Sequence, residues 1–355
     1  MLYNLFMEQS KKKAVVAMSG GVDSSVAALI LKQKGYEVIG LTGKMLNTPA
    51  AETVCNNAKR VADKLGIEFH ILDASEKFQK HVIDYFETSY AEGKTPNPCI
   101  MCNRFIKWGE LFDYAINELG ADIFATGHYA DIRCDNGIYK LYPARDAQKD
   151  QLYFLHRLGQ KQLSKTVFPL CGFDKTQVKN IAIDFDLPPK DSKESQDICF
   201  ITKPNTTKKY LIEKFGIKRG DFIEIGTGKK LGTHDGSYQY TIGQRKGIGI
   251  SAPYPLYVID IDSEKNIVYL GKEEDNYKTR LALKDINLTY PVAEKEFDAF
   301  VKIRYNMPAK KAKCKLLDDL AEIEFYEPVN SVTSGQSGVM YDTNDGHLIG
   351  GGIVI

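Results

Sequence analysis

The strongest constraint on the fold is a loop of glycines and hydroxyl side chains that separates an apolar run from an apolar helix. The loop reads Ser19-Gly20-Gly21-Val22-Asp23-Ser24-Ser25; residues 14–18 before it predict a strand, and residues 26–32 after it predict a buried helix. Backbone N–H groups converge at such a helix start, and the helix dipole favours negative charge there. Gly20 and Gly21 let the backbone approach a phosphate closely. Asp23 would face that phosphate through a Mg²⁺ ion.

Two commoner kinds of loop fit these residues less well. The sequence contains no G-x-x-x-x-G-K-[ST] motif, so a kinase-type P-loop is excluded. A plain strand-to-helix turn needs only one capping Asp or Ser, whereas this loop holds a run of them. The run instead resembles the loop of the ATP pyrophosphatase superfamily, whose members cleave ATP between the α- and β-phosphates and adenylate an oxygen of a second substrate.

The first 205 residues alternate strand and helix patterns. Further strands are expected at 38–41, 69–72 and 123–126, and helices at 54–65, 76–91, 104–119, about 153–164, and 175–185. This alternation predicts a doubly wound parallel sheet, which binds ligands beyond the carboxyl ends of its strands. The loop at 19–25 and the segment Thr126–His128 should therefore meet in one crevice.

The chain is too long, at 355 residues, for one ordinary core. After residue 205 the pattern changes to short alternating runs between glycine-rich turns, which predict strands. Closing the strands after 281 into a small barrel would remove their edges. We therefore expect a multidomain α/β plus β protein: a catalytic domain of the ATP pyrophosphatase type (adenine nucleotide α-hydrolase-like) at 1–205, a β-rich connector at 206–280, and a C-terminal β-barrel at 281–355.

Composition indicates the cellular compartment and the kind of partner. No run of 18 apolar residues and no signal-peptide pattern occurs, so we expect a cytoplasmic chain without a membrane partner. Seven cysteines in such a chain argue against a disulfide scaffold. Residues 201–250 hold ten Lys/Arg against four Asp/Glu, and residues 295–315 hold seven against two. These stretches favour a polyanionic partner.

A second motif, Pro96-Asn97-Pro98-Cys99-Ile100-Met101-Cys102-Asn103, places two thiols before a predicted helix. A helix N-terminus favours the thiolate, so a lowered thiol pKa is expected. Cys199 ends a polar stretch that would serve as a mobile arm carrying a third thiol. Cys102 and Cys199 could instead be small buried apolar residues. Zinc is disfavoured because no second pair of ligands accompanies the C-x-x-C.

Seven motifs follow one another over nearly the whole chain: Ser19–Ser25, Asn97–Asn103, Gly127–Tyr129, Lys149–Phe154, Asp197–Ile201, Gly243–Gly249 and Arg304-Tyr305. Together they resemble the tRNA-specific 2-thiouridylase (MnmA/TrmU) family. The resemblance implies an enzyme that uses ATP to replace the C2 oxygen of the wobble uridine, position 34, by sulfur in the tRNAs for Lys, Glu and Gln.

The resemblance also assigns residues to roles. Cys199 would carry a persulfide, and Cys102 would attack it, freeing sulfur and leaving a Cys102–Cys199 disulfide. The implied ATP contacts are Ala17, Met18, Ser19, Gly20, Gly21, Val22, Asp23, Ser24, Gly43 and Gly127. The implied contacts to the target base are Asn97, Pro98, Cys99 and His128, and those to tRNA are Lys149, Asp150, Gln151, Arg304, Tyr305 and Gln336. The implied partners are the tRNA anticodon arm and a protein that donates persulfide or sulfide, and we expect a monomer.

The chain departs from the family at two positions. Cys99 stands where the best-known members have an acidic residue, so it would act as a general acid or base or in another role. Cys99, Cys102 and Cys199 could alternatively hold a [4Fe–4S] cluster with one iron open to sulfide, and both sulfur routes stay open. Gly43 stands where the family usually has Met, which leaves only a backbone contact to adenine. Two rival functions are another AMP-forming ligase that uses no sulfur, and a non-catalytic tRNA-binding module.

Overall fold

The structure is a computed structural model that describes residues 11–188, 198–201 and 204–355. Its first domain contains five parallel strands in the order β3-β2-β1-β4-β7. They are β1 (Lys13–Ala17), β2 (Glu37–Lys44), β3 (Glu68–Asp73), β4 (Ile123–Thr126) and β7 (Thr166–Val167). The predicted doubly wound parallel sheet is confirmed. The chain order changes direction between β1 and β4, so the ligand crevice of this fold lies beyond their carboxyl ends.

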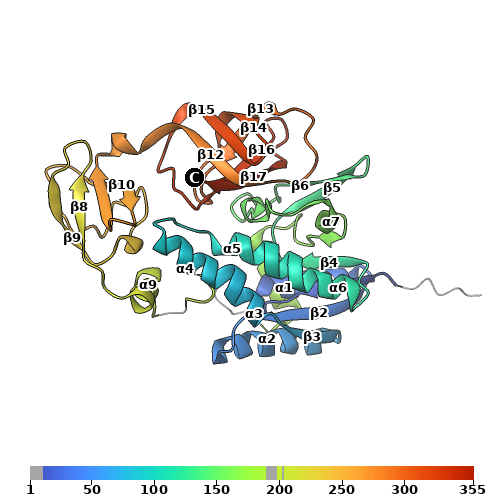
Figure 1. Cartoon of the computed structure of the whole chain (residues 1–355). Coiled ribbons are helices and arrows are strands. Elements are labelled where there is room, and N and C mark those ends of the chain that lie inside the picture. The colour runs from blue at the N-terminus through green and yellow to red at the C-terminus, as the bar shows by residue number, and fades with distance from the viewer. Residues whose placement is uncertain (1–10, 189–197, 202–203) are drawn as a thin grey trace, which may run out of the picture.

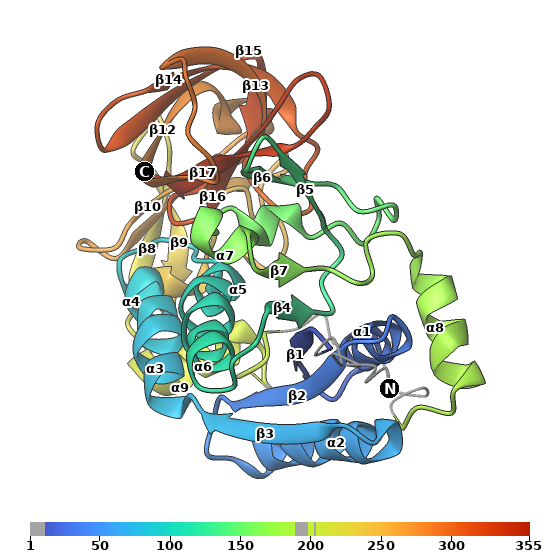
Figure 2. The same cartoon turned by 90° about the vertical axis from the view of Figure 1, so that its right-hand side faces the viewer.

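Helices cover both faces of this sheet (Figure 2). Alternate residues of β1 point to opposite faces. Val16 packs with α1 (Val22–Gln33), α2 (Pro49–Leu65) and α8 (Lys175–Asp184). Val15 packs instead with Trp108 and Phe112, which lie on the opposite helical layer.

That opposite layer contains two long helical segments with π-helical centres (Figure 1). The first runs through α3 (Ser75–Phe78), η1 (Gln79–Ile83) and α4 (Asp84–Ala91). The second runs through α5 (Pro98–Met101), η2 (Cys102–Leu111) and α6 (Phe112–Asn117). This second helix was expected to begin at 104. It begins earlier because Asn97 caps it, accepting a hydrogen bond from the Cys99 N–H at 3.2 Å, and because proline is well suited to a first helical position.

The structure differs from the sequence predictions at two places between residues 131 and 164. The helix predicted at about 153–164 is two short pieces, η3 (Leu152–Leu155) and α7 (Gln160–Leu163), because Gly159 between them is extended. A hairpin of β5 (Asp131–Asp135) and β6 (Ile138–Tyr142) was missed. Its turn residues Asn136 and Gly137 both have positive φ, as a two-residue hairpin turn of type I′ requires.

The middle domain contains α9 (Thr207–Phe215) and a four-stranded sheet. The strands lie in the order β10 (Tyr257–Asp262), β11 (Ile267–Gly271), β8 (Gly220–Glu224) and β9 (Lys230–His234). The predicted β-rich texture is confirmed, although α9 and β9 were not expected.

The last domain is a closed antiparallel barrel, as predicted. Its strands are β12 (Tyr277–Leu288), β13 (Glu296–Lys302), β14 (Lys310–Leu316), β15 (Leu320–Asn330), β16 (Ser337–Tyr341) and β17 (Leu348–Val354). Pairing between β12 and β17 closes the circle. β6 of the first domain pairs with β17 through Leu141 and Leu348, which joins the hairpin to the barrel.

The basic stretch at 295–315 is largely neutralised within the barrel. Lys311 pairs with Asp298 at 3.0 Å, and Lys313 pairs with Glu296 at 3.2 Å. Lys310 also pairs with a carboxylate, that of Glu327 at 2.7 Å. This stretch is therefore a weaker attractor of polyanions than its composition indicates. Within the described part of the chain, no helix has the length and apolar character needed to cross a membrane.

Candidate functional site

The glycine and hydroxyl loop connects β1 to α1, as the sequence predicts. The Ser24 hydroxyl donates to the Gly21 carbonyl at 3.2 Å, and the Ser25 hydroxyl donates to the same carbonyl at 2.8 Å. Gly21 is the N-cap residue of α1 and brings no side-chain cap. The hydroxyls therefore shape the loop, and no side chain caps the helix start, where an anion would bind.

Close backbone packing explains why two positions in the loop region are glycine. A Cβ on Gly20, which has a φ of +70°, would lie 2.9 Å from the Val54 carbonyl oxygen of α2. A Cβ on Gly127 would lie 2.6 Å from the Ser24 backbone nitrogen. The segment after β4 thus contacts the loop after β1, and the predicted meeting of 19–25 with 126–128 is confirmed.

The Asp23 carboxylate is held by two side chains that sequence reasoning missed. The Lys175 ammonium donates to its two oxygens at 2.7 and 2.6 Å, and the Tyr129 hydroxyl donates at 2.9 Å. Lys175 is the first residue of α8, which packs on α1. No local pattern pairs a lysine at 175 with an aspartate at 23. A Mg²⁺ ion would meet this carboxylate only after the ammonium moves.

The other predicted ATP contacts lie on neighbouring strands. Met18 follows β1 and donates its N–H to the Leu41 carbonyl at 2.8 Å. Gly43 lies on β2, where a Cβ would stand 2.9 Å from the Met45 Cε. A hollow of about 350 Å³ beside it is lined by Met45, Leu46, Asn47, Ser75, Glu76 and Gln79. The individual ATP contacts stay predictions.

Three thiols belong to the part of the molecule on the face of the sheet opposite α1, α2 and α8. Cys99 and Cys102 lie on the helix that Asn97 caps, and Cys199 lies on a separate segment. Cys102 and Phe200, the residue after Cys199, pack against one apolar cluster, and negative charge on Cys199 or Cys99 would raise the pKa of the Cys102 thiol. We call Cys99, Cys102 and Cys199 the thiol cluster. All seven cysteines of the chain are free thiols.

The expectation of a lowered thiol pKa was wrong. Loss of hydration raises the pKa of Cys102 to about 12 and that of Cys199 to about 11, and it also raises the pKa of Cys99. Cys99 and Cys199 are exposed at the surface, yet the surrounding protein removes enough water to favour the neutral thiol. Desolvation outweighs the helix N-terminus here, so the thiols are mostly protonated at neutral pH.

One cation opposes this effect at all three thiols. The charge of Lys107 lowers the pKa of Cys99, Cys102 and Cys199. A π-helix bonds each residue to the fifth one along, so Lys107 lies one turn beyond Cys102. Sequence reasoning missed Lys107 because the helix was expected to begin after the cysteines.

Lys107 also contacts His128, the predicted target-base residue. Its Nζ lies 3.3 Å from the buried His128 Nε2, and the His128 Nδ1 lies 2.8 Å from the Thr126 hydroxyl oxygen. An ammonium can only donate, so we assign Nε2 as the acceptor and the ring proton to Nδ1. Burial holds the pKa of His128 well below its usual value, and Lys107 adds to this effect. His128 is therefore a neutral imidazole between the nucleotide loop and the thiol cluster.

The predicted tRNA contacts mostly lie where the domains meet. Tyr305 of the barrel donates its hydroxyl to the Asp150 carbonyl at 3.2 Å, and its ring contacts Phe154. Gln151 accepts the Tyr129 N–H at 3.0 Å. Burial raises the pKa of the Asp150 carboxyl to about 6. These residues connect the barrel to the nucleotide domain, and their contacts with tRNA, like that of the half-buried Lys149, stay predictions.

All three domains meet at Thr95, directly before the thiol helix. The Thr95 N–H donates to the Ser334 carbonyl at 2.9 Å, and the Gln336 amide donates to the Thr95 carbonyl at 2.8 Å. The Thr95 hydroxyl donates to that of Thr241 in the middle domain at 3.2 Å. Arg304 donates to the Ile242 carbonyl at 2.7 Å. We call these contacts the Thr95 junction; it fixes the chain that enters the thiol helix.

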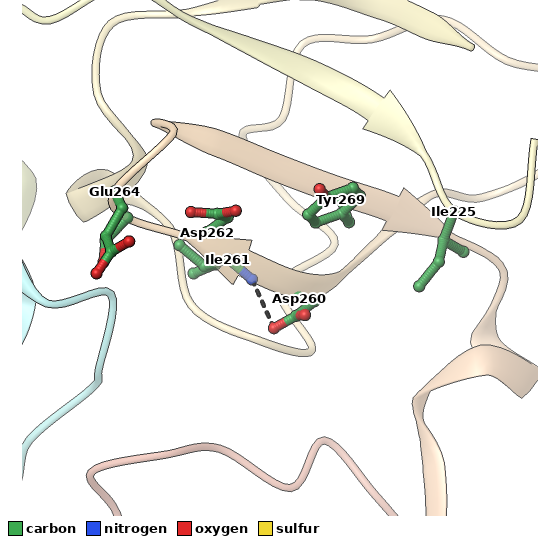
Figure 3. Close-up of a pocket in the computed structure, with 7 residues that line it drawn as sticks. Ile225, Asp260, Ile261, Asp262, Glu264 and Tyr269 are labelled. Carbon is green, nitrogen blue, oxygen red and sulfur yellow. Dashed lines mark hydrogen bonds between the residues drawn. The ribbon is translucent and has the colours of Figure 1, made fainter. Parts of the chain in front are cut away.

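A hollow of about 550 Å³ lies in the middle domain (Figure 3). Its lining includes the carboxylates of Asp260, Asp262 and Glu264. Such a lining repels phosphate groups. It contains none of the residues predicted to contact ATP, the target base or tRNA.

The fold and the site define a class of protein: a doubly wound α/β domain of the nucleotide-binding type that carries a thiol cluster and continues into two β-rich domains. Three family descriptions match in the same order. They are "tRNA methyl transferase HUP domain" over 12–203, "tRNA methyl transferase PRC-barrel domain" over 208–272, and "Aminomethyltransferase beta-barrel domain" over 278–354.

Full-length relatives identify the family. The chain is 41% identical over 358 residues to the tRNA-specific 2-thiouridylase MnmA 2 of Clostridium botulinum strain Okra, covering 97% of this chain and 99% of that one. It shows the same identity and coverage with MnmA 2 of Clostridium tetani. Among solved structures, a 4-thiouridine synthetase–RNA complex with bound ATP matches 57% of this chain and 49% of that one, at 22% identity and a TM-score of 0.37. The chain belongs to the tRNA-specific 2-thiouridylase (MnmA) family of enzymes.

Proposed function

We propose that this enzyme uses ATP to convert the wobble uridine of the tRNAs for Lys, Glu and Gln to 2-thiouridine. The observation that carries the proposal is the link between the nucleotide loop and the thiol cluster. Gly127 contacts the loop, the next residue is His128, and His128 contacts Lys107, whose charge acts on all three thiols. The names of its full-length relatives support this reaction. An anticodon loop is single-stranded, so its base leaves the stack at little cost.

The first step is adenylation. The uracil C2 oxygen attacks the α-phosphate of ATP held at the start of α1, and pyrophosphate leaves. The oxygen becomes an AMP ester, which is a good leaving group at C2. The residues that would act in this step are the loop at 19–25 and Gly127, which contacts that loop. Mg²⁺ would accompany ATP, and Asp23 would meet it after Lys175 moves aside.

The second step is sulfur transfer. A persulfide on Cys199 is attacked by the Cys102 thiolate, which forms the Cys102–Cys199 disulfide and releases hydrosulfide. Hydrosulfide attacks C2, and AMP leaves. A thiol reductant then supplies two electrons to regenerate both cysteines. The charge of Lys107 favours the thiolates that this step needs, because it acts on every member of the thiol cluster.

A second route uses a [4Fe–4S] cluster. The donor chemistry fits, because the three thiols come within electrostatic reach of one another and thiolates are the usual ligands of such clusters. Cys99, Cys102 and Cys199 would hold the cluster. When bound, it would supply an open iron for sulfide. Without a cluster, Cys99 would act as a proton donor or acceptor at the target base. It directly follows Asn97 and Pro98, which the family resemblance also assigns to contacts with that base.

Anaerobic purification, with iron and sulfide analysis, separates the two routes. About four irons per chain, lost in Cys99→Ala, would support the cluster, whereas a metal-free protein active with a persulfide donor supports the thiol relay. Activity is measured as 2-thiouridine in digested tRNA together with AMP release. Full activity in both Cys102→Ser and Cys199→Ser would favour a ligase that uses no sulfur. Absence of ATP turnover with tRNA would favour a binding module.

A further inference from the structure

Cys199 is exposed, but its neighbours are anchored. Ile201 is buried, and the Phe200 ring lies 5.2 Å from the ring of Phe86 and 6.0 Å from that of Phe78, in edge-on contacts. Ring pairs of this geometry stabilise a contact beyond the area that they bury. The expected mobile arm lies mainly at 191–197, outside the described residues. Its Cys199 end is instead fixed to the long helix at 75–91.

The same apolar cluster contacts the other reacting thiol. Phe78, Met101 and Ile106 form part of a buried core against which both Cys102 and Phe200 pack. The same cluster therefore supports both Cys102 and the residue directly after Cys199. A displacement of the Phe200 ring would move Cys199 relative to Cys102.

A hydrogen bond holds the tyrosine that packs beside Phe200. The Tyr210 ring lies 6.0 Å from that of Phe200, and the Tyr210 hydroxyl donates to the Glu87 carboxylate at 2.7 Å. Glu87 is buried and also pairs with Lys214 at 2.7 Å. Because a buried carboxylate needs such partners, Glu87 holds α9 and its tyrosine against the helix at 75–91.

We propose that Phe200 is a positioning residue whose ring, seated between Phe78, Phe86 and Tyr210, fixes the Cys199 thiol beside Cys102. The role of Phe200 in catalysis rests on the proposed function. The inference adds to that function the apolar side chains that hold the two reacting sulfur atoms close together. Tyr210, held by its hydrogen bond to Glu87, forms one wall of the seat of the Phe200 ring.

The test measures how readily the two thiols meet. Metal-free, reduced protein is treated with diamide, which takes up the two hydrogen atoms as the thiols join. The rate of Cys102–Cys199 disulfide formation is followed by peptide mass spectrometry. Phe200→Ala should slow it on the order of tenfold or more, since small displacements of reacting groups have large effects on rate. Phe200→Leu should recover part of the rate, and Tyr210→Phe, which keeps the ring, should have a smaller effect.

Phe215→Ala is the matched control. Phe215 packs against the same apolar cluster as Phe200, but its ring pairs with that of Tyr238 at 5.3 Å, and it has no ring contact with Phe200 among the described residues. The control should keep the wild-type rate, and thermal unfolding checks that each variant is folded. A wild-type rate in folded Phe200→Ala, an equal loss in Phe215→Ala, or no disulfide in the wild-type protein would overturn the proposal.

The oxidation assay contains neither ATP nor tRNA, so it separates the two hypotheses. If thiolation fails while Phe200→Ala still slows disulfide formation, the positioning role stands and the proposed reaction is wrong. If thiolation succeeds, Phe200→Ala should lower kcat for sulfur transfer and leave KM for ATP unchanged. A change confined to KM for ATP would contradict the positioning role.

Discussion

The Gln336 side chain of the barrel donates a hydrogen bond to the Thr95 carbonyl at 2.8 Å, two residues before the asparagine that caps the thiol helix. The last domain thus contacts the chain that carries Cys99 and Cys102. This contact makes the barrel part of the structure that supports the reacting thiols.

Gln336→Ala should lower the free energy of unfolding by about 1 kcal/mol, because one partly buried hydrogen bond is lost. Gln336→Glu should lower it further, since a carboxylate would face the Thr95 carbonyl. Urea unfolding measures both variants, with Gln148→Ala in an exposed turn as the control. Unchanged stability together with weaker tRNA binding would instead make Gln336 an RNA contact.

Lys107→Met should raise the pKa of the thiol cluster, because the cation that lowers it is removed. In metal-free protein at pH 8, alkylation of Cys102 and Cys199 by iodoacetamide should slow by roughly tenfold for each unit of pKa increase. Lys107→Arg should retain most of the rate.

Arg104→Met is the control for this charge, because Arg104 lies on the same helix and its charge is not among those acting on the cluster. Equal slowing in both variants would show that general surface charge, not Lys107, governs the thiols. The pH profile of alkylation should move to higher pH in Lys107→Met alone.

Asp150 should make stability depend on pH. Burial raises its pKa to about 6 in the folded state, from an ordinary value of 3.8. The folded state therefore binds the proton more tightly, so stability falls as pH rises from about 4 to about 6. Asp150→Asn should gain on the order of 1–3 kcal/mol relative to wild type between pH 4.5 and 7. Urea unfolding across this range measures the gain, and a stability difference between the two proteins that stays constant with pH would refute the prediction.

Gly127→Ala should abolish ATP binding, because the new Cβ would lie 2.6 Å from the Ser24 backbone nitrogen at the start of α1. Isothermal titration with ATP and Mg²⁺ measures the loss. Gly172→Ala is the control, since no atom lies within 4 Å of its built Cβ. Wild-type affinity in Gly127→Ala would show that ATP does not bind at this loop.

Local patterns predicted the parts of the fold that depend on neighbouring residues. The strand, loop and helix at 14–33 could be predicted because an apolar run is followed by glycine and hydroxyl residues and then by a second apolar run. The missed hairpin also had a local signal, Asn136-Gly137. An earlier helix start at Pro98 would have placed Lys107 beside the cysteines.

Long-range contacts could not be predicted in this way. Lys175 and Asp23 are 152 positions apart, and Gln336 and Thr95 are 241 apart. Neither pair leaves a periodic pattern, because each contact depends on how whole elements pack. The thiol pKa was misjudged for the same reason: a helix N-terminus is visible in sequence, but the desolvation that outweighs it arises from tertiary packing.

The pairing of Leu141 with Leu348 has a consequence for biosynthesis. Both side chains, together with Val339, are buried in the same core as Val15 and Phe124 of the nucleotide domain. That core stays incomplete on the ribosome until residue 348 has emerged from the exit tunnel. Truncation before this point would leave an apolar gap in the core of the nucleotide domain, so that core can be completed only after the barrel has been synthesised.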